Sequence, residues 1–145
     1  YLICKFNVSC RVILLVMETK TITQVIEFDA LPHEIFNALI ESKRHTEFTG
    51  SRAHIDPTVG GLFSVWDGYA TGKTIEIKPD HKIVQEWRTS EWPEGYFSKV
   101  TFDMRKTDAG TELHFTHEGV PTEFFEDIEK GWEEYYWEPL KEYLR

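Results

Sequence analysis

The histidines of this 145-residue chain come nearest, in type and spacing, to a reactive site. His114 and His117 stand three positions apart and at first sight suggest a metal-binding pair. The residues around them alternate between polar and apolar side chains, which is typical of a strand. Residues three apart on a strand point to opposite faces, so these two imidazoles cannot share one ion. The sequence therefore predicts no metal site at this pair.

Other catalytic signatures are incomplete. His33-Glu34 begins like the zinc-protease motif, but position 37 is Asn and no second histidine follows. The chain contains no G-x-S-x-G, P-loop or nucleotide-binding glycine pattern. Cys4 and Cys10, the two cysteines, lie in the first sixteen residues, outside the expected domain, so a cysteine nucleophile is not supported. We expect no catalytic residues, no cofactor and no metal, and hence no enzyme.

The inward-facing side chains, including His117, allow two interpretations. Buried polar groups usually have hydrogen-bond partners, so His117 can be a satisfied core residue. It can also be a polar anchor at the mouth of a ligand cavity. The aromatic residues present the same choice between a plain core and a cavity lining. The candidate cavity residues are Phe63, Val65, Ile75, Trp87, Phe102, Phe115, His117, Trp132 and Tyr136.

A second candidate site is the loop at residues 91–95, which reads EWPEG. An exposed tryptophan among rigid turn residues is a plausible protein contact. We therefore predict that Trp92, Pro93 and Glu94 touch a partner. The alternative is that Trp92 is a lid over the edge of the sheet.

These candidates must be positioned by a long C-terminal helix, residues 121–145, and by the strands before it. Apolar residues recur there at steps of three and four, which predicts one amphipathic helix with an aromatic stripe. Gly131 would allow close approach, and Pro139 predicts a kink or loosened turn near Glu138. The predicted stripe consists of Phe125, Ile128, Trp132, Tyr135, Tyr136, Leu140 and Tyr143.

The rest of the body predicts a strand, two short helices and then consecutive strands. The alternating strand at 21–29 precedes helices that begin at Pro32 and Ser42. Strands joined by tight turns imply an antiparallel sheet, whose apolar face would receive the helical stripe. This is an α+β architecture. The later strands are expected at 62–66, 73–78, 82–89, 97–106 and 111–118.

Charge and composition limit the partners. The formal net charge is −9, and residues 17–145 carry 14 basic against 25 acidic side chains, or −11. Such a surface repels phosphate, so nucleic acid and anionic membrane are poor partners and a basic protein surface is a better one. Residues 1–16 read as a leader outside the natural fold, with Met17 as the natural start. No disulfide framework can form in residues 17–145, which favours a reducing, cytoplasmic setting.

Several blocks then resemble a known family in order and spacing. They are GGLFSVWDG (60–68), GKTIEIKP (72–79), KIVQEWR (82–88), WPEGYFS (92–98), GTEL (110–113) and GWEEYY (131–136). They resemble the C-terminal domain of the activator of the heat-shock protein 90 ATPase, in the START/polyketide-cyclase-like SRPBCC superfamily. The resemblance implies a helix-grip fold: a curved, seven-stranded antiparallel sheet wrapped around the long helix, with two short helices after the first strand.

The resemblance leaves two functional hypotheses. The first is a stress-related co-chaperone or interaction module that binds a heat-shock protein 90 type chaperone. The second is a binder of a small apolar molecule in the cavity between sheet and helix. Fold alone does not choose between them, because function depends on the site. A structure that shows whether side chains fill the cavity would best distinguish them.

Overall fold

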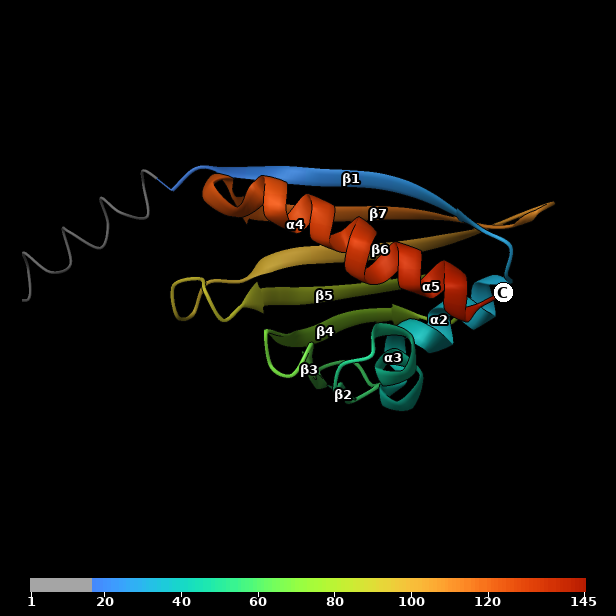
Figure 1. Cartoon of the computed structure of the whole chain (residues 1–145). Coiled ribbons are helices and arrows are strands. Elements are labelled where there is room, and N and C mark those ends of the chain that lie inside the picture. Colours follow the sequence, from blue (N-terminus) through green and yellow to red (C-terminus); the bar gives the residue numbers. More distant parts are fainter. Residues whose placement is uncertain (1–16) are drawn as a thin grey trace, which may run out of the picture.

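The computed structural model describes residues 17–145, so the predicted leader, residues 1–16, lies outside the described part of the chain. The described chain forms one sheet with helices on one side (Figure 1). The elements in order are β1 (Thr19–Phe28), α2 (Pro32–Ile40), α3 (Ser42–Thr49), β2 (His54–Ile55), β3 (Leu62–Val65), β4 (Ala70–Lys78), β5 (Lys82–Thr89), β6 (Ser98–Thr107), β7 (Gly110–Pro121), η1 (Thr122–Phe124), α4 (Phe125–Trp132), η2 (Glu133–Trp137) and α5 (Glu138–Tyr143).

The sheet has seven strands in the order β1-β7-β6-β5-β4-β3-β2, and every pairing is antiparallel. The first strand pairs with the last, which places β1 at one edge and the short β2 at the other. The C-terminal helical segment crosses the covered face of the sheet, while α2 and α3 lie at one end of it (Figure 1). The predicted α+β helix-grip fold is confirmed.

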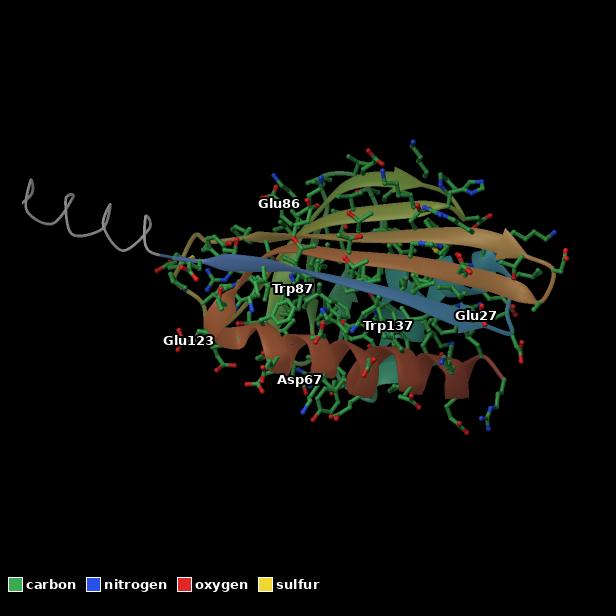
Figure 2. All side chains as sticks on the ribbon, turned by 90° about the horizontal axis from the view of Figure 1, so that it is seen from above. Glu27, Asp67, Glu86, Trp87, Glu123 and Trp137 are labelled. Carbon is green, nitrogen blue, oxygen red and sulfur yellow. The ribbon has the colours of Figure 1, made fainter. Side chains whose placement is uncertain are left out.

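Alternation along the strands decides which side chains enter the core. On β5, Ile83, Gln85 and Trp87 face the helix and are buried. Glu86 projects from the opposite face, and Figure 2 shows it on the outer side of the sheet while Trp87 points toward the helix. One apolar face is therefore covered by the helix, and one polar face remains open.

Ile75 departs from the prediction that it lines the interior. It is 39% exposed, because the alternation of β4 places Ala70, Gly72 and Thr74 on the inner face and Ile75 on the outer one. A bulge between Thr74 and Glu76 then inserts one residue and shifts the alternation beyond it. Ile77 therefore packs against the core, although Ile75 does not. The assignment of Ile75 to the cavity was wrong.

The C-terminal helix forms as predicted but changes its winding. It begins as a short 3-10 turn, continues as α4, widens into the π-helical segment η2, and returns to α-helix in α5. Pro139 has no N–H, so it cannot form the ordinary helical hydrogen bond to the carbonyl of residue 135. The Glu138 N–H, just before it, donates to Glu133 O, five residues back, which is the hydrogen bond of a π-helix.

The π-turn also widens the buried stripe: Trp132, Tyr136 and Leu140 stay buried as predicted, Trp137 joins them, and the prediction that Tyr135 belongs to the stripe was wrong. Trp137, which the predicted stripe omitted, is 3% exposed and faces the sheet (Figure 2), whereas Tyr135 is 55% exposed. Gln24 on β1 holds this segment to the sheet: its Oε1 accepts a hydrogen bond from Trp137 Nε1 at 2.7 Å, and its Nε2 donates to Glu129 O at 3.1 Å.

Candidate functional site

The interior between sheet and helix is filled by aromatic side chains. The Phe115 ring centroid lies 4.5 Å from that of Trp132, 5.1 Å from Trp137 and 5.4 Å from Phe102. The remaining space beside Phe63, Val65, Trp87, Phe102, Trp132 and Tyr136 is about 10 Å³. A single water needs roughly that much room. The predicted cavity residues other than Ile75 do meet as packed core, and Trp87, Trp132 and Tyr136 also line an open groove at its edge.

His117 is fully buried at the centre of a closed hydrogen-bond chain. Trp132 Nε1 donates to His117 Nδ1 at 3.1 Å, which requires the proton to be on Nε2. His117 Nε2 then donates to Ser98 Oγ at 2.7 Å, and Ser98 Oγ donates to Trp87 O at 2.7 Å. Burial lowers the pKa of His117 to about 3, so the ring is neutral. The interpretation as a satisfied core residue fits this arrangement.

The Ser98–His117 pair has the distance of a nucleophile and its base, but not their surroundings. Both residues are buried, and the serine proton is directed to a backbone carbonyl. The second ring nitrogen of His117 meets an indole donor, whereas a catalytic histidine has an acceptor there to orient it. Sequence reasoning missed Ser98, because a serine at the start of a strand carries no signal of its own.

His45 on α3 forms a second buried polar contact that sequence reasoning missed. Its Nδ1 donates to Leu39 O at 3.2 Å, and its Nε2 accepts from the Tyr136 hydroxyl at 3.1 Å. Burial lowers the pKa of His45 to about 4, against the opposing effect of backbone hydrogen bonds. This contact ties the short helices to the C-terminal helix.

Trp92 does not form the exposed contact that was predicted. Its side chain is 3% exposed and packs edge-on against Trp87 at 5.6 Å and Tyr96 at 5.7 Å. The indole extends the aromatic core past the end of β5, because burying so large an apolar ring is favourable. Pro93 and Glu94 are exposed beside it. The lid alternative is therefore the one that the structure supports.

An open groove lies between the C-terminal helix and the β3–β4 hairpin. We call it the aromatic groove, and its volume is about 260 Å³. Its surface is mostly apolar, and one carboxylate stands among the lining residues. These are Trp66, Tyr69, Trp87, Asp127, Ile128, Gly131, Trp132, Tyr135 and Tyr136.

The hairpin presents Trp66 to this groove through an unusual backbone. Trp66 and Asp67 have φ of 56° and 54°, the left-handed region at the two central positions of the turn from Val65 to Gly68, which begins the four-residue connection between β3 and β4. A bulky residue rarely adopts this region, at a cost of roughly 1–2 kcal/mol. The Trp66 ring lies 5.5 Å from Tyr135 and 6.2 Å from Tyr136, both in the helical segment η2.

His114 and His117 point to opposite faces of β7, as predicted. His117 points inward, whereas His114 lies on the outer face beside Glu112. His33 is exposed and contacts Asp80 at 2.9 Å. Within residues 17–145, no three histidine, cysteine or acidic side chains are placed to hold a metal ion together. No helix in that range is long and apolar enough to cross a membrane.

The fold is that of a helix-grip domain. Side chains fill its enclosed interior, so the groups that can contact other molecules lie on the surface. The chain belongs to the family described as "Activator of Hsp90 ATPase homolog 1-like protein", which matches residues 29–145. The family resemblance of the motif blocks is thereby confirmed, and this is an Hsp90-ATPase-activator-like domain.

Individual relatives agree with the family. The chain is 31% identical over 124 residues to the human "Activator of 90 kDa heat shock protein ATPase homolog 1", covering 86% of this chain and 37% of that protein. It is 30% identical over 126 residues to an uncharacterized protein of Schizosaccharomyces pombe, covering 87% of this chain and 38% of that protein. The chain thus spans little more than a third of the curated relatives it matches.

Solved structures show the same fold. An HSP90 activator from Plasmodium falciparum superposes with a TM-score of 0.72 at 30% identity, covering 83% of this chain and 90% of that one. CalU16 from Micromonospora echinospora superposes with a TM-score of 0.75 at 21% identity, covering 88% and 77% of the two chains. The second likeness shows the fold alone.

Proposed function

We propose that this domain is a co-chaperone module that binds an Hsp90-type chaperone in the cytoplasm and changes its ATP turnover. The observation that carries the proposal is the filled enclosed interior of an activator-family domain: about 10 Å³ of space remains beside Phe63, Val65 and Phe102, and the larger aromatic groove is open to solvent. An interior without room for a ligand favours function at the surface. The second hypothesis, a small apolar molecule held in that cavity, lacks this support.

The role we infer is binding rather than catalysis. The buried Ser98–His117 pair points its serine proton at a carbonyl, and its histidine is neutral and enclosed. These features favour a structural network over a nucleophile. The acidic charge, −11 over residues 17–145, favours a basic surface on the partner and an association that weakens with salt.

The exposed residues of the loop after β5 are candidates for the contact with the chaperone. Trp92 anchors the loop from inside, while Pro93 and Glu94 face outward. A loop held by a buried indole offers a preorganised surface, which lowers the entropic cost of binding. We propose that Glu94 is part of the chaperone contact.

The test is to titrate the purified chain into an Hsp90 chaperone and follow ATP turnover and binding at two salt concentrations. Glu94→Lys should weaken a salt-sensitive association. Glu27→Lys makes the same charge change on β1 and should weaken it less; Figure 2 shows Glu27 at the end of the molecule opposite Glu123. Equal effects would remove the loop from the contact, and no binding with no change in turnover would overturn the proposed function.

A further inference from the structure

We propose that the aromatic groove binds a cationic side chain, arginine or lysine, of a partner protein. This inference rests on the proposed function, because it names the kind of residue by which the partner would be anchored. It concerns a surface that the family match does not assign.

The size of the groove suits one side chain better than a whole small molecule. Its volume is about 260 Å³, while pockets for drug-sized ligands measure about 300–1,000 Å³. The groove is open to solvent, as a site entered from a protein surface must be. Gly131 keeps its helix wall low, since an added Cβ there would approach only Tyr135 Cδ2, at 3.8 Å.

The ring lining suits a cation with an aliphatic stem. Trp66, Tyr135 and Tyr136 form edge-to-face contacts on the side of the hairpin, and Trp87 and Trp132 lie 5.6 Å apart at the base. Aromatic faces attract guanidinium and ammonium groups through the ring quadrupole, and tryptophan does so best. The methylene stem of arginine or lysine would pack against the same rings.

The charge of the groove has one sign. Among its nine lining residues Asp127 is acidic and none is basic. Glu91 is also near enough to act on Tyr69, one of the lining residues. Desolvation by burial is the largest cause that raises the pKa of Tyr69, and the charges of Glu91 and Asp127 raise it further. A neutral apolar ligand would gain nothing from these carboxylates, whereas a cation would gain attraction from both.

The backbone of Trp66 supports a role beyond packing. Its left-handed conformation is unfavourable for a bulky residue, and its side chain is only partly buried in return. Such strain persists where the surrounding structure requires it, and it gathers at ligand-binding positions. Here it holds an indole over the groove, opposite the helix.

The test uses the full chain, with the indole N–H signals of its five tryptophans followed by NMR. The probe is N-acetyl-arginine methylamide, and the control is the citrulline analogue, which has nearly the same shape without the charge. Saturable shifts of the Trp66 and Trp132 signals with the arginine probe, weakened by salt and absent with citrulline, are expected. Equal binding of the two probes, or no shift with either, would overturn the inference.

Two pairs of variants sharpen this test. Gly131→Leu should fill the groove and abolish the shifts, while Gly131→Ala, which makes only one ordinary contact, should leave the fold and most of the binding intact. Asp127→Asn should weaken binding about twofold to fivefold, and Glu126→Gln, one residue away and outside the lining, should not. Unchanged binding in Gly131→Leu would overturn the inference.

Chaperone binding separates this inference from the proposed function. If Gly131→Leu binds the chaperone as well as the original chain does, the groove is not the anchor site, and the proposed function stands alone. If the arginine probe binds but no chaperone does, the proposed function fails and the chemistry assigned to the groove is supported. Loss of both in Gly131→Leu, with the fold retained, supports both.

Discussion

Replacing Trp132 with Phe tests the buried network at the centre of the fold. The change removes the indole N–H that His117 Nδ1 accepts at 3.1 Å and leaves a fully buried acceptor unpaired. That loss costs about 1–3 kcal/mol. The smaller ring forfeits about 1 kcal/mol of transfer and cavity energy as well. We expect the free energy of unfolding to fall by about 2–4 kcal/mol, which leaves a domain of ordinary stability folded.

A double-mutant cycle isolates the hydrogen bond. His117→Leu alone leaves the Trp132 donor unpaired, whereas the double variant removes both partners. The double variant should therefore cost about 1–2 kcal/mol less than the sum of the single changes. Urea unfolding at pH 7, followed by circular dichroism, measures all four proteins. Additive costs, or a Trp132→Phe loss below about 0.5 kcal/mol, would refute the network. Glu129→Ala, on the other side of the helix, should be nearly silent.

Two further predictions concern stability. His45 and His117 have lowered pKa values in the folded state, about 4 and about 3, so the unfolded chain takes up protons first as the pH falls below 6.5. The free energy of unfolding should then decrease, with a slope that approaches about 1.4 kcal/mol per pH unit for each histidine. An equal free energy of unfolding at pH 7 and pH 5, measured by urea denaturation, would contradict this. Gly72→Ala should disrupt the β4–β5 pairing, because a Cβ at Gly72 would lie 1.8 Å from Glu86 O, whereas Gly131→Ala should be neutral or stabilising. Thermal melts compare the two, and a tolerated Gly72→Ala would show that these strands can separate locally.

Local patterns were enough to predict the fold class. The alternation of β5 and the helical stripe through Ile128, Trp132 and Leu140 are properties of short stretches of chain, and each identifies a buried face without knowledge of its partner. The inward direction of His117 and the separation of His114 from it follow from the same rule. The two-residue strand β2 is too short to carry such a pattern, and the count of seven strands came from the family resemblance.

Tertiary structure decided what those rules could not reach. Trp92 is buried because Trp87 and Tyr96 lie beside its loop, a neighbourhood that a Pro/Gly-rich segment does not encode locally. The inner face of β4 runs through Gly72 and Thr74, so Ile75 faces outward, and only the bulge after Thr74 brings Ile77 inward. The π-turn adds Trp137 to the buried side of the helix. The partners of His117 and the aromatic groove join segments distant in sequence. Local periodicity reports which face is buried, but only the assembled fold determines what that face meets.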